Sequence, residues 1–168
     1  MRLVLQPDRH GKHARNLRMA IRFHPLAIAA TAGALLLEPG AWATGLAAIW
    51  MVQTFFLAVH GLQQLLSRPT LDVEEICVDT GLLYVPISGI WLIAYTLNYP
   101  LLSFDRATIL LTAVHFTFIS PGALVLAGMA GRQLIHTRAW RLYRVVALVT
   151  VISPLLVASG ITFTQIAG

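Results

Sequence analysis

The sequence predicts an all-α fold, a multipass membrane helix bundle of about five transmembrane helices with its N-terminus in the cytoplasm. Of the 168 residues, 57% are apolar and only 11% are charged, less than half the ~25% charged residues of a soluble domain. Five apolar stretches have about the length that a helix needs to cross a ~30 Å hydrocarbon layer. This composition excludes a disordered tail, a nucleic-acid binder and an ordinary cytosolic enzyme.

The predicted helices follow one another through short loops in a single membrane domain that covers residues 1–168. Basic residues crowd the start of the first helix, and acidic residues lie in the first half of the third. A basic segment, residues 1–21, precedes the first helix, and its charge favours either contact with anionic lipid headgroups or a role as a solubilising tail. The helices are expected at about 22–37, 41–66, 71–97, 107–130 and 143–166.

The basic residues predict the orientation of the bundle. With the N-terminus in the cytoplasm, Arg106 is the only one of the 12 lysines and arginines on the outer side. This asymmetry follows the positive-inside rule, and we expect a multipass protein of the bacterial cell membrane. The one cysteine, Cys77, excludes an intramolecular disulfide and a metal site built from cysteines.

Acidic residues in the third helix are the strongest functional signal. A carboxylate at bilayer depth costs about 2.5–3.5 kcal/mol or more, so it implies a polar interior, a partner or a proton. Asp72, Glu75 and Asp79 are spaced three and four residues apart, which places them on one helical face. Glu74 points elsewhere.

A polar core is predicted where the second and third helices face each other as antiparallel neighbours. His60 is expected at the depth of Glu75, close enough for a hydrogen bond, and Gln53 near the level of Asp79. Desolvation and like-charge repulsion predict that at least one acid keeps a proton near neutral pH, and such a pair suits general acid–base chemistry. In a structural interpretation, the acids instead pair with basic side chains: His60, Arg68 or Arg144.

The fourth helix adds a second histidine, His115, which either relays a proton or forms an interhelical hydrogen bond. No further metal ligands are visible at its level, and neither a metal nor another cofactor is expected. Prolines inside three helices predict either kinks that open the bundle around a ligand or kinks without a pocket, since prolines are common in membrane helices: Pro86, Pro121 and Pro154. Aromatic and polar side chains are expected to line such a substrate pocket: Tyr84, Trp91, Phe116, Phe118 and Gln53.

Residues 81–92 (GLLYVPISGIWL) and 109–116 (ILLTAVHF) resemble the YndJ-like family of bacterial integral membrane proteins. The resemblance covers residues 75–131 and implies a multipass bundle whose biochemical activity is poorly defined. Thr117 stands where family members typically carry a second histidine, so the resemblance does not imply a role for paired histidines. The Glu74–Glu75 pair is also faintly similar to small membrane-bound lycopene and terpene cyclases, in which intramembrane acids protonate an isoprenoid.

Three functions are left open by the sequence. The first is a small membrane-embedded enzyme that cyclises or isomerises an isoprenoid or lipid-like substrate, with catalytic residues Glu75, Asp79, His60 and His115. The second is a proton-coupled transporter that uses the same acids as a relay. The third is a non-catalytic assembly subunit in which the acids hold helices or subunits together. The expected partners are an apolar or lipid substrate, the membrane and a second copy of the chain, but no nucleic acid.

Overall fold

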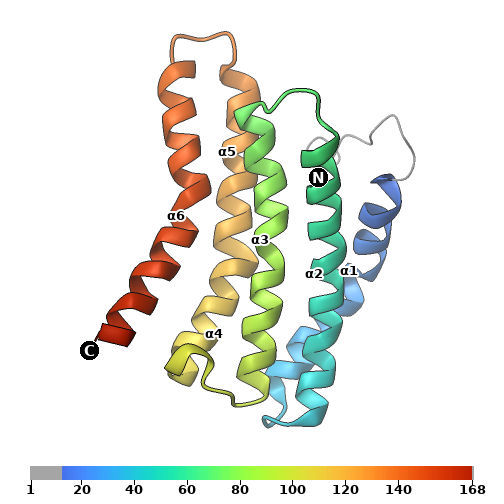
Figure 1. The fold of residues 1–168 in the computed structure, drawn as a ribbon. Helices are drawn as coiled ribbons and strands as arrows, with labels where there is room; N and C mark the ends of the chain where they lie inside the picture. The colour runs from blue at the N-terminus through green and yellow to red at the C-terminus, as the bar shows by residue number, and fades with distance from the viewer. Residues whose placement is uncertain (1–12, 168) are drawn as a thin grey trace.

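The structure, a computed structural model, describes residues 13–167, with side chains for residues 15–160 and 163 except Ser120. Every regular element in this range is helical (Figure 1), and five helical segments are long and apolar enough to cross a membrane. The predicted fold class and number of spans are therefore confirmed. The elements are α1 (His13–Leu36), α2 (Ala41–Ser67), α3 (Val73–Thr96), η1 (Leu101–Ser103), α4 (Arg106–Val114), η2 (His115–Ile119), α5 (Ser120–Leu134) and α6 (Trp140–Ala167).

The first helix begins earlier than expected, at His13 instead of about residue 22. Leu17 and Ala20 in this early part of α1 are buried, and Asn16 Nδ2 donates a hydrogen bond to Gln63 Oε1 of α2 at 3.0 Å. The first turns of α1 therefore pack against α2, a tertiary contact that the basic local sequence does not show. The rest of the predicted basic segment, residues 1–12, lies outside the described residues.

The fourth span consists of three pieces, α4, η2 and α5, and runs to Leu134. η2 is a π-helical turn, whose hydrogen bonds reach one residue further than those of an α-helix. It lies directly before Pro121, which has no amide hydrogen to donate to the carbonyl four residues earlier. The predicted break at this proline is thus a change of helix type.

α3 is the central helix of the bundle. It contacts α2 on one side and α5 on the other, and also α4 and α6, whereas α1 packs outside α2 (Figure 1). In its span 56% of the residues are buried, against 28% or fewer in each of the other four. Several polar residues of α3 are therefore buried almost completely, namely Asp79, Ser88 and Thr96.

Two glycines allow neighbouring helices to approach α3 closely. A Cβ atom on Gly61 of α2 would lie 2.8 Å from the carbonyl oxygen of Asp79, and one on Gly128 of α5 would lie 2.5 Å from that of Glu74. Both distances are too short for a real side chain, so only glycine fits. Small residues commonly permit such close packing in membranes, and here they bring α2 and α5 against the acidic part of α3.

Pro154 lies inside α6 and leaves the carbonyl of Thr150 without its usual amide partner. The Ser153 hydroxyl donates to this carbonyl oxygen at 3.1 Å and so satisfies it. Figure 1 shows α6 leaning away from α5 toward its C-terminal end, while the two helices remain adjacent near their connecting loop. α6 thus diverges from α5, and an opening of the bundle around a ligand stays a prediction.

Candidate functional site

A charged cluster joins three helices at the end of the bundle where α2 ends and α3 begins. It consists of Arg68, Glu75, Asp79 and Arg132. Arg68 Nε lies 2.8 Å from Asp79 Oδ2, and Arg68 Nη2 lies 2.9 Å from Glu75 Oε2. Arg132 of α5 binds the same Glu75 carboxylate with two hydrogen bonds, Nε to Oε1 at 2.7 Å and Nη2 to Oε2 at 2.8 Å. One glutamate therefore connects α2, α3 and α5.

The local sequence explains how each member is positioned. Glu75 and Asp79 are four residues apart on α3, and they share a face as predicted. Arg68 is the C-cap residue of α2, and Arg132 lies in the last turn of α5. Cations are favoured at these two positions because the C-terminal end of a helix carries partial negative charge. The two guanidinium groups thus lie at helix ends that face the acidic start of α3.

The charges of this cluster balance. The Asp79 side chain is fully buried and that of Glu75 is 18% exposed, while those of Arg68 and Arg132 are 25% and 29% exposed. Two arginines therefore neutralise two carboxylates in a largely desolvated place. The guanidinium groups supply positive charge beside both carboxylates, and the proton expected on one of the acids stays a prediction. The geometry agrees with the structural interpretation, with Arg68 as one of the partners that it names.

His60 is connected to the cluster through Gln64, a residue that the sequence analysis missed. The Gln64 amide nitrogen lies 3.1 Å from His60 Nε2, and its oxygen accepts a hydrogen bond from Arg68 Nη2 at 3.4 Å. His60 also interacts electrostatically with Asp79. Gln64 follows His60 by four residues on α2, which is the spacing of two side chains on one helical face, so this signal was present in the sequence.

The predicted alignment of α2 with α3 is wrong in one respect. Gly61 packs against Asp79, and Trp50 Nε1 donates to Ser88 Oγ at 3.0 Å. Gln53, about 10 Å along α2 from His60, therefore does not reach the level of Asp79. The error arises because a short loop makes two helices antiparallel neighbours but does not determine which residues of one helix lie level with which residues of the other.

Gln53 instead belongs to the interface between α1 and α2. Its amide nitrogen lies 3.2 Å from His24 Nδ1, and its buried oxygen has no hydrogen-bond partner among the described residues. It lines an apolar cavity of about 490 Å³ together with residues of both helices, among them Met19, Phe23 and Phe56. This cavity is separate from the charged cluster.

Glu74 is a second buried acid that the sequence analysis did not select. It points away from Glu75, as expected, but the side chain is packed where α5 and α6 meet α3, next to Gly131 and Tyr143. Its Oε2 atom has no hydrogen-bond partner among the described residues. A periodicity argument identifies the face of Glu74 but not the helix that covers it. Asp72, by contrast, is exposed and accepts a hydrogen bond from the Thr70 hydroxyl.

His115 and two of the aromatic candidates form a different group, between α3, η2 and α6. His115 is half-buried and lines a cavity of about 100 Å³ with Ser153 and Pro154 of α6. Phe116 packs edge-to-face against His115 and against Tyr84, with ring centroids 5.4 and 6.2 Å apart. The Tyr84 hydroxyl donates to the carbonyl oxygen of Val151 at 2.8 Å. These contacts are interhelical packing with a small adjoining cavity.

The remaining two aromatic candidates do not join either group. Trp91 is half-buried against Phe104, with ring centroids 5.7 Å apart, near the opposite end of α3. Phe118 is 69% exposed on the outer surface, because residues two positions apart on a helix point to nearly opposite faces and Phe116 is the one that faces inward. The nine predicted site residues are therefore distributed over several places. His60, Glu75 and Asp79 lie in or beside the charged cluster, whereas Tyr84, His115 and Phe116 lie together elsewhere. Among the described residues, no group of three or more His, Cys, Asp or Glu could hold a metal ion.

Comparisons with known proteins agree with the architecture. The sequence profile of the YndJ-like protein family matches residues 1–168. The chain is also 34% identical over 145 residues to the "Uncharacterized membrane protein YndJ" of Bacillus subtilis strain 168. This alignment covers 86% of the chain but only 26% of the relative, so the chain spans about a quarter of that protein's length. No solved structure matches, and neither match supports the similarity to terpene cyclases.

Proposed function

The chain belongs to the YndJ-like family of membrane proteins, and we propose that its bundle is a non-catalytic assembly domain. The observation that carries this proposal is the arginine clamp on Glu75, in which Arg68 and Arg132 approach one carboxylate from two different helices. A clamp of this kind fixes the relative height and rotation of α2, α3 and α5. The Bacillus relative is about four times longer than the matched region, which fits a bundle that serves as one module of a larger membrane protein.

The energetics of buried ion pairs support a positioning role for this cluster. Removing one partner of such a pair costs about 3–5 kcal/mol, whereas replacing the whole pair by apolar residues is often neutral. A buried pair therefore contributes less to net stability than to the choice of one arrangement over others. In a bundle of apolar helices, which pack against one another about as well as against lipid, such selection determines the register of the helices.

A membrane-embedded acid–base enzyme is the second candidate. Its support is Glu74, a buried carboxylate with one oxygen that has no hydrogen-bond partner among the described residues, together with His115 beside a cavity. Cyclisation or isomerisation of an isoprenoid or lipid-like substrate would need an acid that touches the substrate. Glu75 and Asp79 are bound to arginine, and neither lines any of the four cavities traced in the described part of the chain.

A proton-coupled carrier is less well supported by the same geometry. A relay must release its acid from the cation in each cycle, but the Asp79 side chain is fully buried and bound by Arg68.

We further propose two kinds of contact for the assembly domain. Anionic lipid headgroups would meet the exposed arginines at the start of α1, Arg15 and Arg22, and the exposed apolar faces of α1 and α6 would meet other membrane helices or a second copy.

The lipid content of cells that express the protein distinguishes assembly from enzymatic activity. We expect wild type, E75Q and D79N to give the same lipid and isoprenoid profile by mass spectrometry as cells with an empty vector. E75Q and D79N should instead lower the yield of folded protein, because each removes the negative charge of a carboxylate that an arginine binds. E38Q, which changes an exposed acid in the α1–α2 loop, is the control and should leave the yield unchanged.

One result would overturn this proposal in favour of the enzyme. It is a lipid or isoprenoid product that depends on wild type and is missing with D79N, although D79N is folded and present in the membrane at the wild-type level.

A further inference from the structure

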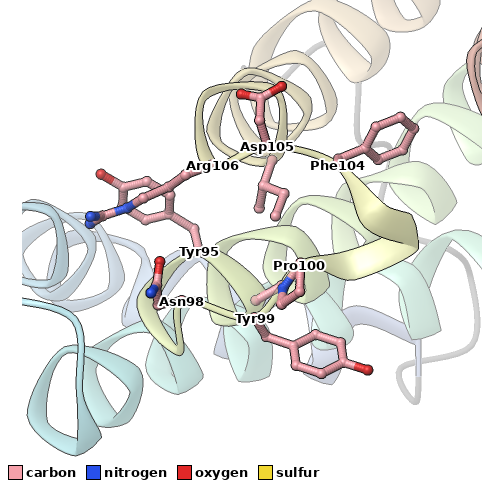
Figure 2. A pocket seen from close by; sticks show the side chains of 9 residues that line it. Tyr95, Asn98, Tyr99, Pro100, Phe104, Asp105 and Arg106 are labelled. Carbon is pink, nitrogen blue, oxygen red and sulfur yellow. The ribbon is translucent and has the colours of Figure 1, made fainter. Parts of the chain in front are cut away.

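A second polar site lies at the end of the bundle opposite the charged cluster. An open surface cavity of about 300 Å³ is lined there by the last turn of α3, the loop over residues 97–105 and the start of α4. Figure 2 shows the side chains around this cavity. The lining residues that matter for the argument are Tyr95, Asn98, Tyr99, Phe104, Asp105 and Arg106.

Arg106 is held in place but has no anionic partner among the described side chains. Its guanidinium carbon lies 4.5 Å from the centre of the Tyr95 ring, a cation–π contact that orients the group. Among the residues that the structure describes, no hydrogen bond or ion pair involves the Arg106 side chain, whereas Arg68 and Arg132 both bind carboxylates. Its N–H donors, arranged as a planar fork, are therefore available to a ligand.

Asp105, although adjacent in sequence, does not neutralise Arg106. One carboxylate oxygen accepts hydrogen bonds from the backbone N–H groups of Ala107 and Thr108 at 2.9 and 3.1 Å, and the other accepts from the Thr108 hydroxyl at 2.6 Å. These bonds cap the N-terminus of α4. In Figure 2 the carboxylate of Asp105 points away from the guanidinium, which extends over Tyr95. The carboxylate is thus committed to the helix cap.

The loop that forms the cavity wall has an unusual backbone. Asn98, Leu102 and Ser103 have φ angles of 52°, 54° and 62°, a left-handed conformation that is uncommon for residues other than glycine. Backbone hydrogen bonds hold this conformation, from Tyr99 N to Ala94 O at 3.0 Å and from Phe104 N to Leu101 O at 3.1 Å. Strained backbone of this kind is concentrated at binding and catalytic sites, and here it gives the cavity a fixed wall.

The position in the membrane indicates what an arginine would meet at this place. α3 ends at Thr96 and α4 begins at Arg106, so the cavity lies where two spans leave the hydrocarbon layer. Lipid phosphate groups lie at this depth. Arg106 is also the one basic residue that the predicted orientation places on the outer side, where basic residues are depleted. A guanidinium matches the geometry of a phosphate through two parallel hydrogen bonds.

From these observations we propose that this cavity binds a phosphate group, with Arg106 as its bidentate ligand and Tyr95 holding the guanidinium in place. The phosphate belongs either to a phospholipid headgroup or to a soluble phosphate ester, and the walls formed by Tyr99 and Phe104 contact the group attached to it. This site shares no residue with the charged cluster, so it holds whether or not the bundle is an assembly domain.

Binding of short-chain ligands to the detergent-purified protein tests the proposal. The probes are dioctanoyl-phosphatidylglycerol, glycerol 3-phosphate and, as a probe without phosphate, dioctanoylglycerol. Affinity is measured from the rise in unfolding temperature with ligand concentration and from the fluorescence of Trp91, which contacts Phe104 of the cavity wall. We expect saturable binding of a phosphate probe to wild type and at least about tenfold weaker binding to R106Q, since the charge-assisted hydrogen bonds are lost.

Two further variants distinguish the contribution of the planar guanidinium geometry to binding from the contribution of its positive charge. R106K keeps the charge but not the fork, and should bind with intermediate affinity. R141Q removes an equal charge from an exposed arginine at the other end of the bundle, and should bind as wild type does. Equal affinity for glycerol 3-phosphate and the lipid supports the site and assigns it to soluble phosphate esters, whereas preference for the lipid supports it as a headgroup site.

Three results would overturn the proposal: R106Q binding as tightly as wild type, dioctanoylglycerol binding as tightly as dioctanoyl-phosphatidylglycerol, or no saturable binding of either phosphate probe.

Discussion

Arginines at the two ends of the bundle have opposite surroundings. Arg68 contacts two carboxylates, one of them fully buried, and its neighbourhood is closed by tight helix packing at Gly61. Arg106 contacts a tyrosine ring, has no acid partner among the described residues and borders a cavity. On our proposals, an arginine whose donors are used by acids positions the helices, whereas one whose donors are unused binds a ligand.

Loss of the arginine side chain at each end should have very different consequences. R68M leaves the fully buried Asp79 without its cation, a change that costs about 3–5 kcal/mol and lowers the unfolding temperature in detergent by roughly 10 °C. R106M removes only an exposed cation–π contact worth about 0.5–1 kcal/mol, which corresponds to about 2 °C. Differential scanning fluorimetry of both variants checks this prediction. Equal shifts would remove the distinction between the two ends.

Tight packing near the charged cluster predicts that a methyl group added to a glycine of α5 lowers the free energy of unfolding by an intermediate amount. G128A places a Cβ atom 2.5 Å from the carbonyl oxygen of Glu74, so α5 must move away from α3 at a cost of about 1–3 kcal/mol. G122A, on the same helix, has nothing within 4 Å of its new Cβ and serves as the control. Unfolding in urea and detergent measures both. A neutral G128A would show that this interface is loose.

The smallest effect on stability is expected from the pH dependence of the Asp105 cap of α4, at the end of the bundle opposite the charged cluster. Hydrogen bonds from Thr108 and Ala107 hold the pKa of Asp105 below its usual range. Because the folded-state pKa is lowered, the cap stabilises α4 above the ordinary aspartate pKa and is lost as pH falls through the lowered value. We expect the Ala107 and Thr108 amides to exchange hydrogen faster, after correction for the intrinsic rate, only in strongly acidic solution. D105N should show no such transition, and a transition in both proteins would refute the assignment.

The sequence predicted the spans and the shared face of Glu75 and Asp79 because both depend on spacing within one chain segment. It named Arg68 as a possible partner since the α2–α3 loop is short. It did not identify Arg132, which is 57 residues from Glu75, because the relative rotation of helices that are not neighbours in sequence depends on tertiary packing. The exposure of Phe118 was missed for another reason: Phe116 and Phe118 are two residues apart, so a helix directs them to nearly opposite faces, and only Phe116 is buried.

Glu74 illustrates the same distinction on a single helix. Its direction followed from the helical period, but its burial depends on two glycines of α5, Gly128 and Gly131, that let neighbouring backbone and Tyr143 approach. Single glycines in an apolar span are common in membrane proteins, so the sequence alone did not indicate that α5 packs closely against α3 at these positions. The cavity beside Arg106 likewise depends on a loop conformation with positive φ angles at residues other than glycine.

A double-mutant cycle between Glu75 and Arg132 tests most directly whether the arginine clamp holds the helices together. Unfolding free energies in mixed detergent micelles are measured for wild type, E75Q, R132M and the double variant. A control cycle combines E75Q with R141M, a change at an exposed arginine. We predict that the double variant is less destabilised than the sum of the single variants by at least about 1 kcal/mol, with no coupling in the control. Additive effects at Glu75 and Arg132 would contradict the account.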